Sequence, residues 1–118
     1  MASDASQVTF IVDQIQGAGL IAYRKMFGEY AIYCDTKVVG LVCDNQLFIK
    51  PTTAGKEFVG DILMAPPYPG AKPHFLIEER LDDREWITEL VKITAQEIPF
   101  PKPKKPRRSS NGFLNLQN

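Results

Sequence analysis

The chain has 118 residues, 44% of them hydrophobic, and equal numbers of basic and acidic side chains. Its length suits a single domain with a packed core. No run approaches the roughly 18 apolar residues of a membrane span, and the N-terminus lacks the basic and apolar regions of a secretory signal. We therefore expect a cytoplasmic protein that has no membrane partner.

The zero net charge hides an asymmetry along the chain. Residues 1–97 contain nine basic and fourteen acidic side chains, a net charge of −5, whereas residues 98–118 contain five basic side chains and no acidic one, a net charge of +5. Four prolines are interleaved with these basic residues, which prevents regular structure. We interpret residues 1–97 as the folded domain and residues 98–118 as a basic, Pro-rich, mobile tail.

The first expected element is an amphipathic helix at about residues 5–16. Four apolar residues follow the spacing i, i+3, i+4 and i+7 that places them on one helix face: Val8, Ile11, Val12 and Ile15. Ser3 or Ser6 can cap the start of this helix, and Gly17 can end it. We expect the helix to pack onto a sheet.

Residues 21–26 alternate as in a short strand, and residues 30–50 predict a three-stranded antiparallel meander. The breaks in the meander, Asp35-Thr36 and Asp44-Asn45, are only two residues long, which is typical of tight hairpins. With ideal turns, the core face carries Ala31, Tyr33, Val38, Gly40, Val42, Leu47 and Ile49. The second face carries Tyr30, Ile32, Cys34, Lys37, Val39, Leu41, Cys43, Gln46, Phe48 and Lys50.

The second face of the meander is polar at its ends and apolar in the middle. An antiparallel sheet with one face in water should alternate cleanly, so we expect another segment of the chain or a second copy to cover the middle. Both turns lack the glycine that type I′ turns prefer. The register can therefore slip by one residue, which would exchange the two faces.

A short helix and a loop follow the meander. Thr52 or Thr53 can cap the helix, which runs through residues 54–59 and ends at Gly60. Residues 61–73 contain four prolines and predict an ordered loop without regular structure.

Residues 74–78 form the last expected strand, which Pro73 favours at an edge of the sheet. The last helix should run from about 83 to 97, because Asp82 and Glu85 have the spacing of a capping box. The sequence thus predicts an α+β fold. Its antiparallel sheet has about four or five strands and is packed by an N-terminal and a C-terminal helix.

The two cysteines do not predict a disulfide. In the expected register Cys34 and Cys43 share a face, but Cys34 lies opposite Lys37, six residues from Cys43. That separation is roughly 20 Å at about 3.3 Å per residue, whereas bridged Cα atoms lie within about 7 Å. We expect reduced, partly buried thiols. Because the cysteines are nine residues apart and the chain has a single histidine, we expect no metal site. We also expect no cofactor.

Five segments carry a resemblance to a known family: RKMFGEY at 24–30, IY at 32–33, GLV at 40–42, LFIK at 47–50 and YPGAKP at 68–73. In combination they resemble the N-terminal domain of the TfoX/Sxy family, over about residues 5–97. The resemblance implies a small α+β domain with an antiparallel sheet packed by helices. It supplies no catalytic residues.

Full-length members of this family regulate natural competence together with a cyclic-AMP-responsive transcription activator, and they carry a second, helical domain. This chain has a short basic tail where that domain would begin. The resemblance therefore implies a stand-alone N-terminal domain of unassigned biochemical activity. We expect a protein partner in transcription regulation, and self-association into a homodimer.

Two groups of residues are candidates for binding. Arg24 and Lys25, ahead of Phe27, could form a basic–aromatic surface for a phosphate backbone or an acidic partner. The alternative is a solvated basic pair at a strand edge. Lys50 and Lys72 would extend the surface if the proline-rich loop folds back.

The loop from Ala65 to Pro73 has two interpretations. It can line a pocket with Tyr68 and Lys72, or it can cover a sheet face over four apolar residues, Ile32, Val39, Leu41 and Phe48. His74 is interpreted as a strand-end side chain, because no nucleophile motif is near it. No P-loop, GxGxxG, HExxH or GxSxG pattern occurs, so we expect a non-enzymatic protein. A small enzyme with a site at the Tyr68–Lys72 loop is a less favoured hypothesis.

Five basic residues in the tail could bind nucleic acid by electrostatic attraction to its phosphates: Lys102, Lys104, Lys105, Arg107 and Arg108. Such binding would be weak, independent of sequence and strongly salt-dependent. The alternative is a solubilising terminus. Our leading hypothesis is a non-enzymatic cytoplasmic interaction and regulatory module. Nucleic-acid binding through Arg24, Lys25 and the tail is the second hypothesis.

Overall fold

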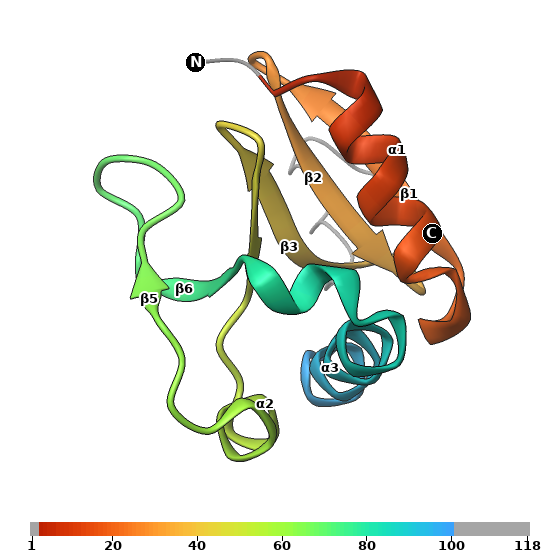
Figure 1. Ribbon diagram of the computed structural model, residues 1–118, viewed down its shortest axis with the longest axis vertical. Helices are drawn as coiled ribbons and strands as arrows, with labels where there is room; N and C mark the ends of the chain where they lie inside the picture. Colours follow the sequence, from red (N-terminus) through yellow and green to blue (C-terminus); the bar gives the residue numbers. More distant parts are fainter. Residues whose placement is uncertain (1–2, 101–118) are drawn as a thin grey trace, which may run out of the picture.

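Residues 3–100, the part of the chain that the computed structural model describes, form one antiparallel sheet with three α-helices (Figure 1). The strands are β1 (Ile21–Met26), β2 (Glu29–Cys34), β3 (Lys37–Cys43), β4 (Gln46–Ile49), β5 (Met64–Ala65) and β6 (His74–Ile77). The helices are α1 (Ala5–Gln14), α2 (Thr53–Val59) and α3 (Arg84–Glu97), with short 3₁₀ turns at Gln16–Ala18 and Glu79–Asp82. The order in the sheet is β1-β2-β3-β4-β6-β5. This confirms the α+β class and the meander.

Three two-residue turns join the first four strands. The turns are Phe27-Gly28, Asp35-Thr36 and Asp44-Asn45, and all six residues have a positive φ. This is the geometry of type I′ turns, whose twist matches that of the flanking strands. The two tight turns of the meander are confirmed, although neither contains glycine.

The predicted register is right between β3 and β4 but only partly right between β2 and β3. Leu41 pairs with Phe48 as expected, and Tyr33 pairs with Val38. A bulge then shifts the register, so that Ile32 pairs with Gly40 instead of Val39. The extra residue exchanges the two faces of β2 relative to β3.

Because of this bulge, the expected faces are wrong for β2 and for the start of β3. Tyr30, Ile32 and Cys34 lie on the core face with Val39, and not on the second face. Cys34 and Cys43 therefore lie on opposite faces of the sheet and do not share one. Both thiols are free and buried, as expected.

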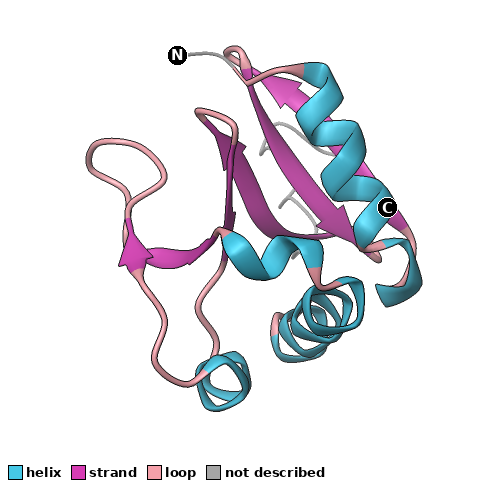
Figure 2. Ribbon diagram, viewed as in Figure 1, coloured by secondary structure: helices cyan, strands magenta, loops and turns pink. Residues whose placement is uncertain are grey.

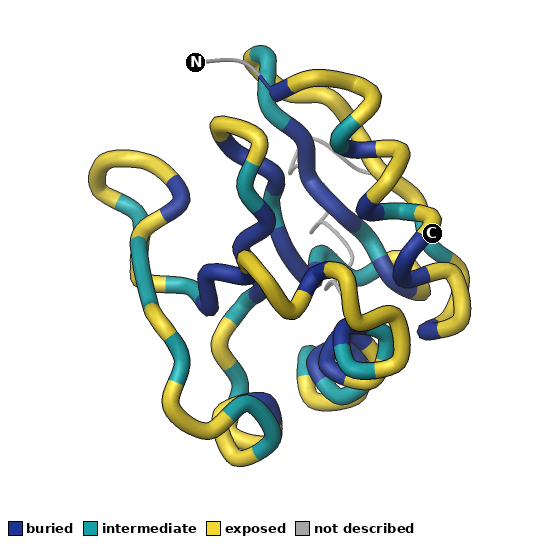
Figure 3. The backbone as a smooth tube through the Cα atoms, in the orientation of Figure 1, coloured by how far each residue is buried: buried dark blue, intermediate teal, exposed yellow. Residues whose placement is uncertain are grey.

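The core lies between the sheet and the helices α1 and α3 (Figure 2). Its largest fully buried side chains come from both layers: Phe75, Ile11, Ile15, Ile32, Leu47, Ile49, Ile87, Leu90, Val8, Val39, Val42 and Val91. The helical spacing in residues 5–16 predicted three of them. Figure 3 shows this burial along β2, β3 and β4, in contrast to the exposed turns.

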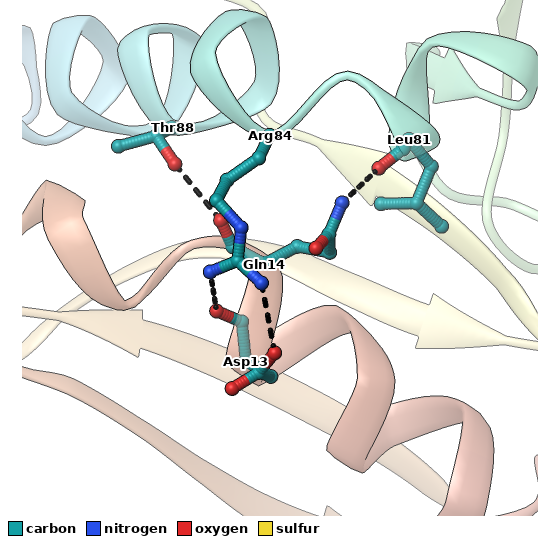
Figure 4. Close-up of polar contacts among 5 residues, drawn as sticks. All are labelled: Asp13, Gln14, Leu81, Arg84 and Thr88. Carbon is teal, nitrogen blue, oxygen red and sulfur yellow. Dashed lines mark hydrogen bonds and ion pairs between the residues drawn. The ribbon is translucent and has the colours of Figure 1, made fainter.

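Polar contacts hold the end of α1 against the start of α3 (Figure 4). Arg84 forms an ion pair with Asp13 at 3.0 Å and donates a hydrogen bond to its backbone carbonyl. The buried Gln14 donates through Nε2 to the carbonyl of Leu81, and its own carbonyl accepts from the Thr88 hydroxyl. These bonds satisfy the polar groups of a helix end that packs against apolar surface.

The helix boundaries differ slightly from the sequence prediction. Asp4 precedes α1 without a side-chain cap, so neither expected serine caps it, and Ile15 rather than Gly17 follows its last turn. Asp83, not Asp82, caps α3 by accepting from the Trp86 amide. The Thr52 cap of α2 is confirmed.

The carboxylate of Glu97 at the end of α3 caps α2 from outside. It accepts hydrogen bonds from the amides of Thr53 and Ala54, both at 2.9 Å. These two bonds favour the charged form and lower the pKa of Glu97. The last turn of α3 is thus tied to the first turn of α2.

The position of the last strand corrects the prediction. β6 lies between β4 and the two-residue strand β5, so it is not an edge strand. The expected loop at 61–73 thus contains a short strand. Pro73 immediately before β6 is tolerated because it precedes the first paired residue. Within residues 3–100 no helix is long and apolar enough to cross a membrane.

Candidate binding groove on the open face of the sheet

A groove of about 450 Å³ lies on the sheet face that α1 and α3 leave uncovered. We call it the open-face groove. It is lined by the β1–β2 turn on one side and the proline-rich loop on the other, with β3 between them: Met26, Phe27, Glu29, Tyr30, Leu41, Cys43, Pro67 and Tyr68. Most of these side chains are apolar, and a volume of this size is within the range of ligand pockets.

The rim of the open-face groove consists of exposed apolar side chains. Phe27 is completely exposed, Tyr68 is 56% exposed and Met26 is 44% exposed. Phe27 also occupies a backbone position with φ +53°, which disfavours bulky side chains. No packing contact within residues 3–100 therefore explains an aromatic residue at this position.

The floor of the groove continues into a second, smaller apolar cluster. Cys43, Phe48 and Leu76 are its buried members, and Leu41 and Ala65 pack against it. This confirms the expectation that the middle of one meander face is apolar. The proline-rich loop covers this face in part, because Pro67 is buried and lines the groove beside Leu41.

The loop does not cover all four residues that the sequence suggested. Leu41 and Phe48 belong to the cluster on the open face. Ile32 and Val39 point to the opposite face and are buried against the helices. The bulge at Val39 is the reason, since it turns these two side chains toward α1 and α3.

The one carboxylate of the groove is occupied by structural hydrogen bonds. Glu29 accepts from the Ser3 hydroxyl at 2.6 Å and from the Asp44 amide at 3.1 Å. The same hydroxyl accepts from the Asn45 amide. Glu29 thus joins the N-terminal segment to the β3–β4 turn.

Cys43 is not arranged as a nucleophile. Burial raises the pKa of its thiol, and the nearby Glu29 carboxylate raises it further. A cysteine becomes reactive when its pKa is lowered, which requires the opposite environment. Within residues 3–100 no hydrogen bond joins the Cys43 thiol to a basic side chain.

The structure brings together two of the six candidate binding residues. Phe27 and Tyr68 line the open-face groove from opposite sides. Lys50 and Lys72 do not line it. Four further groove residues were not predicted from the sequence: Met26, Leu41, Cys43 and Pro67. The apolar middle of the second face was a signal for Leu41 and Cys43.

Arg24 and Lys25 lie side by side on β1 but point to opposite faces of the sheet. Arg24 pairs with Ala31, whereas Lys25 pairs with Tyr30 on the helix-covered face. They do not form one basic patch, because neighbouring strand residues alternate. The tail residues of the nucleic-acid hypothesis, 102–108, lie outside the described residues.

The proline-rich loop holds no catalytic arrangement around His74. Its Nδ1 atom lies 2.8 Å from the carbonyl of Lys72, and no hydrogen bond joins it to another side chain within residues 3–100. In the same part of the chain no three histidine, cysteine or acidic side chains gather in a way that could hold a metal ion. His74 does not line the open-face groove, whose lining is mostly apolar.

Two comparisons with known proteins found similar sequences. A family model described as the TfoX N-terminal domain matches residues 13–98. A protein of Spirochaeta aurantia, described as an uncharacterized 12.7 kDa protein in the trpE 5′ region, is 41% identical over 112 residues. That alignment covers 95% of this chain and 97% of the relative.

Proposed function

The chain belongs to the family of TfoX N-terminal domains, and on this basis we propose that it is a non-enzymatic regulatory module that binds a partner protein through the open-face groove. The proposed role is of the competence-regulating or transcription-coactivating kind that full-length members of the family suggest. The protein acts in the cytoplasm. It needs no cofactor, because its task is to hold a partner.

The exposed Phe27 at the rim of the groove carries this proposal. A fully exposed aromatic side chain, on a turn residue with positive φ, adds no packing energy to the fold. Exposed apolar surface beside a groove marks a binding site, and aromatic residues are enriched where interfaces gain most energy. Tyr68 on the opposite rim gives the site a second aromatic contact.

The absence of an activated nucleophile in the groove supports a binding role over catalysis. The pKa of Cys43 is raised, and Glu29 is engaged by Ser3 and Asp44. A general base must lie within hydrogen-bond reach of the proton that it abstracts. The hydrogen bonds of Glu29 hold its carboxylate against Ser3 and the β3–β4 turn. The groove offers apolar contact area instead.

Site-specific photo-crosslinking in cells tests this function. The photoreactive amino acid p-benzoylphenylalanine is placed at Phe27 in one variant and at Phe10 in a matched control. Phe10 is 40% exposed, but it lies on α1, away from the groove. We expect discrete crosslinked species from position 27 and none from position 10, identified by mass spectrometry.

The mass of the crosslinked species identifies the class of partner. A regulatory protein supports the proposal. A product of twice the mass of the chain means that a second copy of the chain occupies the groove. In that case the groove serves self-association, and the proposal of a different partner protein is contradicted. Identical crosslinks from both positions, or none from position 27, contradict the proposal.

A further inference from the structure

Among the described residues, the strand β1 has one unpaired edge. It is the first strand in the sheet order and pairs only with β2 among the described residues. Five of its six side chains are exposed. An edge of this length presents unpaired backbone groups that can accept another extended segment.

The pairing with β2 determines which backbone groups of β1 point outward. The two-residue turn at Phe27-Gly28 closes on the pair Met26–Glu29, and the Asp35 amide donates to the carbonyl of Leu20. In an antiparallel pair, bonded and non-bonded positions alternate. The amides and carbonyls of Ile21, Tyr23 and Lys25 therefore point away from the sheet.

The charges along this edge are positive on both faces. Arg24 lies on the same face as Met26, beside the open-face groove, and Lys25 lies on the helix-covered face with Tyr23. The ring of Tyr23 contacts that of Tyr30 edge to face at 5.8 Å. Neither Arg24 nor Lys25 forms an ion pair within residues 3–100.

The same charges disfavour a second copy at this edge. Joining two β1 strands would bring two arginines and two lysines to one seam, and like charges across a strand pair are destabilising. Basic side chains on edge strands protect sheets against such self-pairing. A segment with acidic side chains would instead be attracted to Arg24 and Lys25, whereas a second copy of β1 would be repelled by them.

We propose that β1 pairs antiparallel with an extended acidic segment of a partner protein. This rests on the proposed function and specifies the chemistry of the partner. In this pairing, an apolar residue lies opposite Met26, two adjacent acidic residues lie opposite Lys25 and Arg24, and an apolar residue lies opposite Tyr23. Two acidic residues in a row are required because Arg24 and Lys25 point to opposite faces.

The arrangement connects the edge to the open-face groove. Met26 belongs to both, since it ends β1 and lines the groove with Phe27. A partner that continues beyond Met26 therefore reaches the exposed aromatic rim. Backbone bonds to β1 would give affinity, and the two charges would give selectivity.

A peptide titration followed by NMR tests the inference. The probe is a blocked hexapeptide of sequence LEEVTV, and the control is LKKVTV. We expect LEEVTV to shift the amide signals of β1 and to slow hydrogen exchange at Tyr23 and Lys25. Exchange at Arg24 is not expected to change, because its amide already faces β2.

Reversal of the two charges supplies the matched variant. In Arg24→Glu/Lys25→Glu the preference should invert, so that LKKVTV binds at least fivefold more tightly than LEEVTV. Both side chains are exposed, and an unchanged amide spectrum outside β1 confirms that the variant folds. An unchanged preference overturns the inference.

Two further outcomes are informative. If a ten-residue oligothymidylate displaces LEEVTV and exchange at Tyr23 is never slowed, charge alone explains binding and the edge inference fails. If LEEVTV does not bind while position 27 still crosslinks to a partner, the edge inference is overturned and the proposed function stands.

Discussion

The two faces of the sheet differ in how completely their apolar side chains are buried. The helix-covered face is closed, with Ile32, Val39 and Val42 completely buried beneath α1 and α3. The open face has a small buried cluster around Phe48 and a groove rimmed by Phe27 and Tyr68. Most of the buried apolar side chains lie on the helix-covered face, so we expect this face to contribute most of the stability. The other face retains exposed apolar surface that no segment of the described part of the chain covers.

The largest loss of stability is expected from a substitution on the helix-covered face. Leu90→Ala removes a fully buried side chain of α3 and should lower the free energy of unfolding by about 2–5 kcal/mol. Urea denaturation measures this change. The control, Met26→Ala at the groove rim, should change stability by less than about 0.5 kcal/mol. Equal losses would show that the two faces contribute alike.

A smaller effect is expected from Gly40→Ala on β3. An added Cβ would lie 2.5 Å from the Phe48 carbonyl oxygen and 3.0 Å from the Ile49 side chain. Because the strand must shift to relieve this overlap, the free energy of unfolding should fall by about 1–3 kcal/mol. A lowered thermal midpoint measures this loss. A variant as stable as the parent would mean that this part of the sheet is less closely packed than the structure indicates.

Phe27→Asn should increase stability by about 0.5–1 kcal/mol. Asn-Gly is the preferred sequence of a type I′ turn, and the lost aromatic ring made no buried contact. The same variant should lose the partner in a pull-down with the identified protein. Loss of stability on this substitution would indicate that Phe27 is a structural residue.

The reactivity of the two cysteines compares the solvent accessibility of the two faces without a change to the fold. Cys43 is 7% exposed and lines the groove, whereas Cys34 is completely buried. In native protein an aromatic disulfide reagent should modify Cys43 first, and Cys34 only after unfolding. The variants Cys34→Ser and Cys43→Ser assign the two rates.

The pH dependence of this reaction has a defined sign. Burial raises the pKa of both thiols, so the reactive thiolate is scarcer in the folded chain at neutral pH. The rate at Cys43 should therefore rise with pH and continue to rise above the range in which a free cysteine is already ionised. A rate that levels off at lower pH than for free cysteine would contradict the raised pKa.

Much of the architecture was predictable from local patterns. The spacing of Val8, Ile11 and Ile15 predicted α1, and the two-residue breaks predicted the turns of the meander. The bulge at Val39 was not predictable. The turn residues at both ends of β3 are those of regular two-residue hairpins, so they give no sign of the extra residue between them.

The candidate site was predictable only in fragments. Phe27 and Tyr68 were named from the sequence, but their meeting across one groove depends on the fold of the proline-rich loop. Arg24 and Lys25 look like one basic pair in the sequence. In the sheet they are separated, because neighbouring residues of a strand point to opposite faces.

The sequence by itself determined the elements of this protein, since helical spacing, turn residues and caps act over a few neighbouring residues. It also determined the family, through motifs that lie in those elements. Only the tertiary structure decided which face of β2 is buried, where β6 lies, and that a groove remains open beside Phe27. These depend on packing between segments far apart in the chain, which local patterns do not encode.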